Sequence, residues 1–411
     1  MKAFAAVVTL EEALERYLAA LWPQPRGEET VPLERALDRV CAADIRAAED
    51  LPPFHRSTVD GYAVRSQDLL HASPRAPVAL QLVGSVQMGE VPDLRVEPGQ
   101  CARVPTGGVV PTGADAVVMQ EHTQAEGQAV HVFRPVALGE NVLHQGEDAR
   151  RGEVVIRRGT RLRPQELGLL AGLGVVDVPC YLPPRVAVFS TGDELVPPDC
   201  QPRPGQVRDM NAYTLTAQVA RLGGVPRFGG ILPDQAAVVE AALRDAMRTA
   251  DVVLASGGSS VGVLDVLGEV VPRLGQPGVV VHGVAIKPGK PTLLAVCDGK
   301  AVVGLPGHPA SAMVVFDLLV RPVLEAMLGI RPDARGPRTV PANLVAPLTA
   351  PRDRDEFVRV RLRWQEDVLA AEPVLGKSGM ITTMTRADGY VRVPTGTQLD
   401  AGTSVEVRLF D

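Results

Sequence analysis

The feature that most constrains the fold is an alternation of strand and helix patterns between residues 185 and 328. Apolar runs such as "RVAVFS" and "DVVLAS" are typical of strands that are buried on both faces. The segment "DQAAVVEAALRDAMR" predicts an amphipathic helix, because its apolar residues recur with helical spacing. Strands that alternate with helices predict a largely parallel sheet that is covered by helices on both faces.

The flanking regions consist mainly of short strands. Residues 54–140 form valine-rich runs separated by turns such as Asp60-Gly61, which predicts a β-rich module. After the polar stretch "GIRPDARGP", the segment "FVRVRLRW" alternates apolar and charged residues, and we expect its arginines to face solvent. Near the start of the chain, Thr9 and Glu12 predict a capping box for an N-terminal helix.

Together these patterns predict a multidomain fold of the α/β plus β class, because 411 residues exceed one ordinary core. We expect an α/β domain with a mostly parallel sheet, a β-rich N-terminal module and a small C-terminal β-barrel or sandwich, of which the family resemblance described below implies the barrel. The expected bounds are 1–26 for an N-terminal helix that packs on the body, 27–50 with 141–177 for a mixed α/β linker domain, 51–140 for the β-rich domain, 178–328 for the α/β domain and 329–411 for the barrel.

Composition argues against several classes of partner. The net charge of −6 and the 4% aromatic content favour neither nucleic acid nor an anionic membrane. No apolar run reaches membrane-spanning length. The five cysteines are scattered without a C-x-x-C pair, which argues against a zinc site or a disulfide framework and fits a reducing cytoplasm. Any anion site must therefore be built locally.

Ligands of open α/β sheets bind beyond the carboxyl ends of the strands, and this rule selects the loops of a candidate site. The loops are "STGDEL", "LPD", "SGGSSVG" and "LPGHPAS". The "SGGSSVG" loop is the strongest anion cradle, because glycines allow close backbone approach and serines offer donors ahead of a helix. Asp193 and Glu194 are adjacent carboxylates, which suit Mg²⁺ binding or proton transfer.

Each of these loops also has a structural alternative. The "SGGSSVG" loop is alternatively a plain turn, and the polar residues of "STGDEL" are alternatively helix caps. Asp234 directly precedes a helix, so it would also serve as an N-cap. Asp265 lies in a first helical turn, where it would either favour the helix dipole or face a ligand. His308 would act as an acid or base only with a partner, which the sequence does not reveal.

The stretch "AIKPGKPTLLAV" places Lys287 and Lys290 on a proline-stiffened loop between two apolar strands of the same unit. Prolines fix φ, so this loop loses little entropy when its two cations bind an anion. The alternative is a solvated turn with exposed lysines. The position of the loop among the strand ends favours an anion site.

In their order along the chain, these motifs resemble those of the molybdopterin molybdenumtransferase family, which includes MoeA-type proteins and the gephyrin E domain. The matching stretches are "PPFHRSTVDGYAV", "PGQCARVPTGGVVPTGADAVVMQE", "GED", "VAVFSTGDEL", "GQVRDMNAYTL", "ASGGSSVG", "AIKPGKPTLLA" and "GLPGHPASA". The ordered set is highly specific and spans nearly the whole chain. The chain departs from the commoner pattern at His55, Arg56, Thr58, Val59, Ser259 and His308, the last of which is often asparagine.

The resemblance implies a cytoplasmic transferase of molybdenum cofactor biosynthesis, an elongated homodimer in which the β-rich module completes the partner's site. Its α/β domain would bind molybdopterin. Molybdate and adenylylated molybdopterin would be the substrates. Cleavage of the phosphoanhydride, assisted by Mg²⁺ or a similar divalent cation, would release AMP. A molybdopterin adenylyltransferase and recipient apo-molybdoenzymes would be further partners, and no role is implied for nucleic acid or a membrane.

The resemblance also assigns residues to roles. The catalytic residues would be Asp60, Thr106, Asp148, Glu194, Asp234 and Asp265. Glu194 and Asp265 would bind the metal ion. Lys287 and Lys290 would hold molybdate or the phosphates of the substrate, and Arg354 and Ser378 of the barrel would add anion contacts. The other expected substrate-binding residues are Ser190, Thr191, Gly192, Asp193, Ser256, Gly257, Gly258, Ser260, Pro306 and Gly307.

Two other functions are compatible with parts of the sequence. A molybdopterin adenylyltransferase would resemble the α/β domain alone, and the two β modules count against it. A non-catalytic scaffold or metal carrier would not need the carboxylates and lysines of the site. The combination of cations for anionic substrates with carboxylates for a bridging divalent ion favours the transferase.

Replacing Lys287 and Lys290 together by alanine is expected to abolish molybdate-dependent release of AMP, because the anion loses both cations of the stiff loop. The rate of AMP release from adenylylated molybdopterin checks this, and circular dichroism verifies that the variant is folded. Release at the wild-type rate would contradict the assignment of this loop to an anion.

Overall fold

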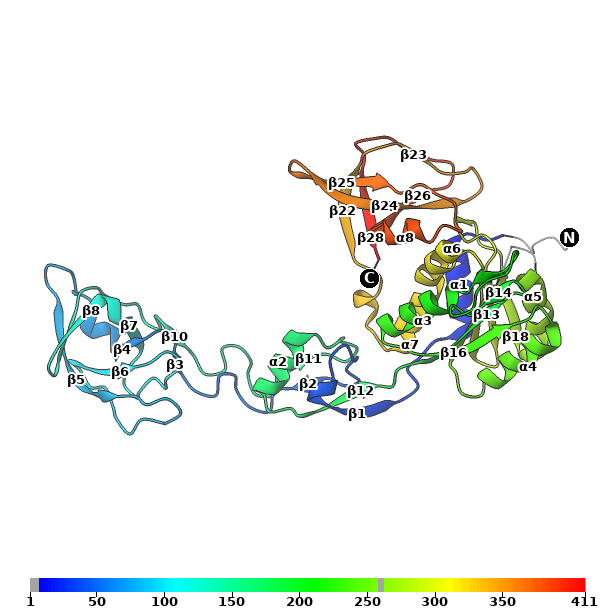
Figure 1. Ribbon diagram of the computed structural model, residues 1–411. Helices are drawn as coiled ribbons and strands as arrows, with labels where there is room; N and C mark the ends of the chain where they lie inside the picture. The colour runs from blue at the N-terminus through cyan, green and yellow to red at the C-terminus, as the bar shows by residue number, and fades with distance from the viewer. Residues whose placement is uncertain (1–6, 258–261, 411) are drawn as a thin grey trace.

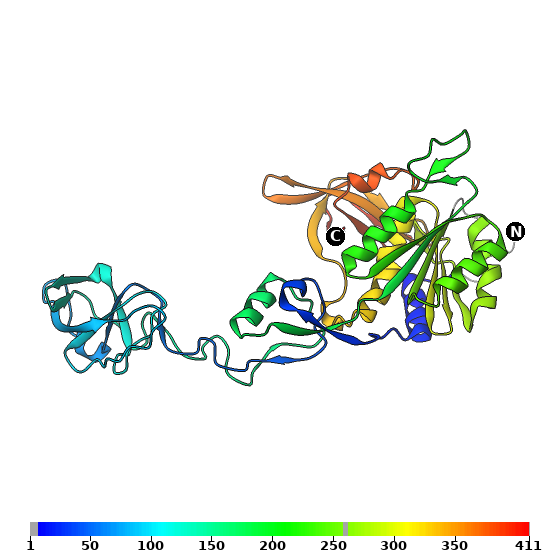
Figure 2. The ribbon, with the colours of Figure 1, turned by 60° about the horizontal axis from the view of Figure 1, so that its bottom comes forward.

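The computed structural model of the chain describes residues 7–257 and 262–410, with side chains from residue 266 onward in the second range. Figures 1 and 2 show an elongated molecule in which a β-rich unit, a small middle unit and an α/β unit follow one another. A C-terminal β unit lies beside the α/β unit (Figure 1). Each unit has buried apolar residues of its own.

The α/β unit is built on a six-stranded sheet with the order β16-β13-β17-β21-β20-β18. Its strands are β13 (Arg185–Thr191), β16 (Val225–Leu232), β17 (Val252–Gly257), β18 (Pro277–His282), β20 (Leu293–Cys297) and β21 (Lys300–Pro306). The first four strands in the sheet are parallel, whereas β20 and β18 are antiparallel to their neighbours. The prediction of a largely parallel sheet is confirmed.

Helices cover both faces of this sheet. One face packs on α1 (Leu10–Leu21), α3 (Asn211–Leu222), α6 (Pro309–Val315) and α7 (Arg321–Met327), and the other on α4 (Ala236–Ala246) and α5 (Gly262–Leu274). Val188 and Leu254 face the first group of helices, and Ala187 and Val253 face the second. Because successive strand residues point to opposite faces, an unbroken apolar run serves both cores.

The N-terminal helix α1 begins where the sequence predicts. Thr9 Oγ1 accepts a hydrogen bond from the Glu12 N–H at 3.2 Å, which satisfies one of the free donors of the first turn. The Glu12 carboxylate pairs with Arg16 one turn further along. The structure therefore shows the serine/threonine half of the predicted capping box.

The β-rich unit is a six-stranded sheet with the order β7-β4-β6-β5-β9-β8. Its strands are β4 (Gly61–Val64), β5 (Val78–Ser85), β6 (Gln100–Val104), β7 (Ala116–Met119), β8 (Thr123–Glu126) and β9 (Ala129–Val132). The short strands β3 (Arg56–Ser57) and β10 (Val142–Leu143) pair where the chain enters and leaves the unit. Leu80, Val118 and Val130 are buried in its core, as the valine-rich runs predict.

The middle unit is formed by two passages of the chain. β1 (Glu28–Pro32) pairs with β12 (Asp177–Tyr181), and β2 (Ile45–Arg46) pairs with β11 (Val154–Ile156), both antiparallel. The helix α2 (Pro164–Gly172) completes the unit. Figures 1 and 2 show this unit between the β-rich and the α/β units, so it separates them along the molecule.

The C-terminal unit is a closed five-stranded barrel. Its strands are β22 (Thr339–Leu344), β24 (Asp355–Gln365), β25 (Val368–Pro373), β26 (Gly389–Val393) and β28 (Ser404–Leu409). The order is β24-β25-β22-β28-β26, and a further pairing of β26 with β24 closes the ring. Closure removes free strand edges, and the predicted C-terminal β-barrel is confirmed.

A short strand of the α/β unit joins this barrel. The apolar run "VVVHGVAI" does not form one continuous strand, because β18 ends at His282. The next strand, β19 (Ile286–Lys287), pairs in parallel with Asp355 and Glu356 at the start of β24. The Asp355 N–H donates to Ala285 O at 3.0 Å. Two units therefore share backbone hydrogen bonds at the loop that carries Lys287.

The helical segment after residue 309 contains a π-helical turn, η4 (Phe316–Val320), between α6 and α7. Asp317 on this turn is 4% exposed, and its carboxylate pairs with Arg321 and accepts a hydrogen bond from Tyr390 of the barrel. Arg408, also from the barrel, places its Nε 3.0 Å from Asp317 Oδ2. This buried network links α/β unit and barrel a second time, and π-turns commonly mark such sites.

A search of the described helices for a span that is long and apolar enough to cross a membrane finds none.

Replacing Asp317 by alanine should lower the free energy of unfolding by about 3–5 kcal/mol, because it removes a buried carboxylate that pairs with buried Arg321 and half-buried Arg408. The measurement is the midpoint of urea unfolding. A matched control is Asp333→Ala, since Asp333 is an exposed partner of Arg331, and this change should cost about 0–1 kcal/mol. Equal midpoints for the two variants would contradict a stabilising role for the buried network.

Candidate functional site

The carboxyl ends of three parallel strands bring the predicted strand-end residues together. In the sheet register, Ser190 lies opposite Ser256, and Thr191 lies opposite Gly257. Gly257 in turn lies opposite Pro306 at the end of β21. The structure therefore places "STGDEL", the start of "SGGSSVG" and "LPGHPAS" at one edge of the sheet, as the position of ligands in such sheets predicts.

Several buried polar atoms at this edge have no hydrogen-bond partner within the described part of the chain. They are Ser190 Oγ, Ser256 Oγ, Asp209 Oδ2, Asn211 Oδ1 and Asp234 Oδ1. Ser190 and Ser256 are 0% and 1% exposed. Because buried polar groups are nearly always paired, a cluster of unpaired atoms at one sheet edge indicates that water or a polar ligand completes it.

Asp209 and Asn211 are residues of this edge that the sequence prediction missed. Asp209 Oδ1 accepts a hydrogen bond from the Ala212 N–H at 3.2 Å, and Asn211 Nδ2 donates to Gly307 O at 2.9 Å. They precede or begin α3, so a sequence pattern would classify them as helix caps. Each of them also has an unpaired buried oxygen, which indicates a second role and is visible only in the tertiary structure.

The helix-capping alternatives are not what the structure shows. β13 is followed by the short strand β14 (Leu195–Val196), which pairs with β15 (Val207–Arg208), and not by a helix that Ser190, Thr191 or Asp193 would cap. The residue at the cap of α4 is Gln235, without a side-chain hydrogen bond to the helix. Asp234 instead leaves Oδ1 buried and unpaired.

The carboxylates of Asp193, Glu194 and Asp234 lie near one another at this edge. The Asp234 N–H donates to Asp193 Oδ1 at 3.3 Å. Burial, followed by the charges of Asp193 and Glu194, raises the pKa of Asp234 above its ordinary value. A Cβ on Gly192 would lie 2.4 Å from Glu194 Oε2, so only glycine lets this carboxylate fold back over the loop.

These carboxylates offer hard oxygen donors of the kind that Mg²⁺ prefers. No three His, Cys, Asp or Glu side chains within the described ranges are grouped closely enough to hold a metal ion by themselves. Mg²⁺ in phosphate-handling sites commonly takes one or two carboxylates and fills its other positions with water and substrate oxygens. The residues present fit that second kind of site.

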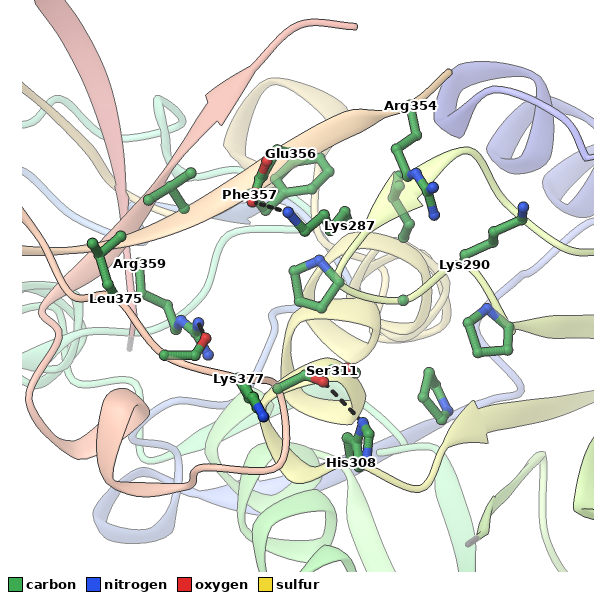
Figure 3. A pocket seen from close by; sticks show the side chains of 18 of the residues that line it. Lys287, Lys290, His308, Ser311, Arg354, Glu356, Phe357, Arg359, Leu375 and Lys377 are labelled. Carbon is green, nitrogen blue, oxygen red and sulfur yellow. Dashed lines mark hydrogen bonds and ion pairs between the residues drawn. The ribbon is translucent and has the colours of Figure 1, made fainter. Parts of the chain in front are cut away.

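A pocket of about 740 Å³ lies between the sheet edge and the barrel. Five cationic side chains line it, Lys287, Lys290, Arg354, Arg359 and Lys377, with Glu356 as the carboxylate among the described lining residues. They come from β19 and the loop after it, from β24 and the residue before it, and from the loop after β25; Figure 3 shows how their side chains lie. This excess of positive charge suits a ligand with several negative charges.

The "KPGKP" loop that carries two of these cations has a defined shape. Thr292 is fully buried, and its Oγ1 donates to Gly289 O at 2.7 Å. Gly289 has φ of +117°, and a Cβ there would lie 2.4 Å from Val315 Cγ2. Glycine is therefore required for the loop to pack on α6, which holds the lysines in place.

The two lysines have different surroundings. Lys287 Nζ lies 2.8 Å from Glu356 Oε1, an ion pair shown in Figure 3 that offsets part of its charge. Lys290 is half-buried and lines the same pocket. Arg354 pairs with exposed Asp353, at 3.1 Å between Nε and Oδ1, and also lines the pocket.

The prediction that the arginines of "FVRVRLRW" face solvent is wrong for Arg359. This side chain is 9% exposed and donates to Thr383 Oγ1 and to Gly376 O at 2.8 and 2.7 Å. Burial lowers the pKa of Arg359. Both hydrogen-bond partners of Arg359 belong to the C-terminal unit itself, so a later segment of that unit covers this side chain, which also lines the pocket.

Asp60, Thr106 and Asp148 lie far from this pocket within one chain. Asp60 Oδ1 accepts a hydrogen bond from the Thr106 N–H at 2.8 Å, so these two residues are neighbours in the β-rich unit. All three residues are exposed. Figures 1 and 2 place that unit at the opposite end of the molecule from the α/β unit.

Three predicted site residues, Gly258, Ser260 and Asp265, lie wholly or partly outside the described part of the chain. Gly258 and Ser260 lie outside the described residues, and so does Ser259. Asp265 lies in the first turn of α5, as predicted, but its side chain is outside the described part.

Family models match the chain in three consecutive segments. They are the MoeA N-terminal region (domain I and II) at residues 8–174, a probable molybdopterin-binding domain at residues 187–326 and the MoeA C-terminal region (domain IV) at residues 341–410. The order of the matches follows the order of the structural units.

Similar proteins cover nearly all of the chain. The molybdopterin molybdenumtransferase of Bacillus subtilis is 35% identical over 94% of this chain and 91% of its own length. That of Synechococcus elongatus is 34% identical over 98% and 99%. A crystal structure of a molybdopterin biosynthesis MoeA protein from Pyrococcus horikoshii superposes with a TM-score of 0.85 at 32% identity, covering 98% of this chain and all of that one.

Replacing Asp234 by asparagine should raise the free energy of unfolding near neutral pH by about 0.5–2 kcal/mol, because it removes a charge that the fold disfavours. A carboxyl group whose pKa is raised in the folded state lowers the free energy of unfolding as pH rises above about 4, which is its pKa in the unfolded chain. The gain should therefore shrink toward acidic pH. Thermal midpoints measured across pH check this, with exposed Asp199→Asn as the control; a loss of stability at neutral pH would contradict it.

Proposed function

Because the chain belongs to the molybdopterin molybdenumtransferase family of molybdenum cofactor biosynthesis, we propose that it inserts molybdate into adenylylated molybdopterin and releases AMP. The observation that carries this proposal is the pocket between the α/β unit and the barrel, with its five cationic side chains. Both substrates are anions, and the rest of this acidic chain would repel them.

The cationic side chains of the pocket would have different roles. Lys290 and Arg354, together with Ser378, would contact molybdate or the phosphates of the nucleotide, since all three line the pocket. Lys287 is held by Glu356 and contributes a weaker net charge. Arg359 donates to the loop that carries Lys377 and so supports the wall of the pocket.

The unpaired buried hydroxyls at the sheet edge would bind polar groups of the molybdopterin moiety. Ser190 and Ser256 lie side by side in the register and have unused donors. Thr191, Gly192, Gly257, Pro306 and Gly307 shape the same edge. An edge that lacks partners of its own gains hydrogen bonds when such a ligand binds, which favours a polar substrate over an apolar one.

A divalent cation such as Mg²⁺ would be held by Glu194 and by Asp265, with Asp193 and Asp234 close by. The ion would offset negative charge that develops on the leaving phosphate. Burial, and after it the charges of Asp193 and Glu194, raises the pKa of Asp234, and a bound cation would offset these negative charges.

The site is proposed to be shared between two chains of a homodimer. Asp60 and Thr106 are held together yet face solvent, and one chain does not bring them to its own pocket. An elongated molecule can place its β-rich unit, with Asp60 and Thr106, over the pocket of a partner, and Asp148 lies on the segment that leaves this unit. A cytoplasmic adenylyltransferase would supply the substrate, and apo-molybdoenzymes would receive the product.

The test is release of AMP from adenylylated molybdopterin by the full chain. Release should require both molybdate and Mg²⁺, and Glu194→Gln should lower its rate by about 10²–10³-fold, the usual effect of removing one electrostatic contributor. Formation of adenylylated product from ATP and molybdopterin would instead identify an adenylyltransferase. Absence of any release would support a scaffold or carrier.

A mixed dimer distinguishes a shared site from a site within one chain. Asp60→Asn and Lys290→Ala chains should each be inactive alone. When the two chains assemble at random, half of the dimers are mixed, and each mixed dimer contains one intact shared site out of two. The mixture should therefore regain about a quarter of the wild-type activity. The control mixes Lys290→Ala with Lys287→Ala, which lie on the same loop and should not complement. No recovery in the first mixture would place the whole site in one chain.

A further inference from the structure

His308 lies at the rim of the pocket, on the side away from Arg354 in Figure 3, and contacts the barrel. It precedes α6 as the N-cap residue but makes no side-chain hydrogen bond to that helix. Its Nδ1 instead lies 2.8 Å from Ser378 Oγ. The Ala310 N–H also donates to Ser378 O at 3.2 Å, so both units fix this contact.

We propose that His308 is a positioning residue that couples the binding of an oxyanion in this pocket to the uptake of a proton. The inference rests on the proposed function, because it takes the pocket ligand to be an oxyanion with two negative charges. His308 acts through Ser378, which lines the pocket.

The coupling follows from the single proton of the serine hydroxyl. When His308 is neutral with Nδ1 unprotonated, the Ser378 hydroxyl donates to it and presents only lone pairs to an anion. When Nδ1 carries a proton, His308 donates to Ser378 Oγ, and the hydroxyl proton is free for the anion. The neutral tautomer with a proton on Nδ1 would also permit this, but only the imidazolium adds a positive charge beside a dianion.

The charges around His308 decide when it becomes protonated. Those that line the same pocket are Lys287, Lys290, Arg354, Arg359 and Lys377, with Glu356 as the opposing carboxylate among the described residues. α6 contributes no charged side chain, and the start of α3 contributes Asn211 on Gly307 O and the carboxylate of Asp209. A bound dianion would add negative charge beside His308 and so favour the imidazolium.

The test is calorimetric titration of the full chain with molybdate, and with sulfate as a second dianion, at about pH 6 and pH 8, the range in which histidine titrates. Repeating the titrations in buffers of different ionisation enthalpy counts the protons taken up. The wild-type protein should take up as much as one proton and bind more weakly at the higher pH, by up to about tenfold per unit.

The matched variant is His308→Asn, whose amide is a donor of similar shape that does not titrate. It should bind both anions with an affinity that hardly changes with pH and without the proton uptake. His71→Asn, at an exposed position of the β-rich unit, should behave as the wild-type protein does. Thermal melting verifies each fold, and His308→Gln replaces the asparagine variant if the latter is unfolded.

Two outcomes would overturn the inference while leaving the proposed function standing, provided that AMP release depends on molybdate. One is wild-type binding that is independent of pH and takes up no proton. The other is a His308→Asn variant that keeps the full pH dependence. If the wild-type protein binds neither anion at any pH, the inference and the oxyanion assignment of the pocket both fail.

Discussion

The pairing of β19 with β24 is the interaction on which the rest of the site depends. Two residues of the α/β unit, Ile286 and Lys287, pair with the start of β24, a barrel strand that lies many residues later in the chain. This pairing holds the "KPGKP" loop against the barrel, so the pocket has walls from two units. Backbone hydrogen bonds in a parallel ladder define register, and this register sets Lys287 directly beside Glu356.

A buried charge network strengthens the same junction. Asp317 lies on a π-helical turn of the α/β unit and contacts Tyr390 and Arg408 of the barrel. Buried ion pairs contribute little net stability compared with apolar packing, but they are sensitive to geometry. The network therefore favours one orientation of the barrel, and with it one spacing of the cations in the pocket.

The sequence predicted local features well where a pattern of residues is compatible with only one kind of structure. The unbroken apolar runs of β13 and β17 serve two cores, and the alternation in β24 belongs to a barrel. Prediction from the sequence failed where the environment of a residue is formed by a segment that is distant along the chain. Arg359 has the spacing of a solvent-facing residue, yet it is buried because a later segment of the same unit, with Gly376 and Thr383, covers it.

The order of motifs and the alternation of strands and helices determined the fold class, the family and the strand-end loops, because both depend on residues that are near in sequence. Only the tertiary structure decided that Lys287 faces Glu356, that Asp209 and Asn211 leave buried oxygens unpaired at the sheet edge, and that His308 has Ser378 as its partner. These contacts join segments from different strands, helices and units. Their geometry depends on how the units pack, which no local pattern encodes.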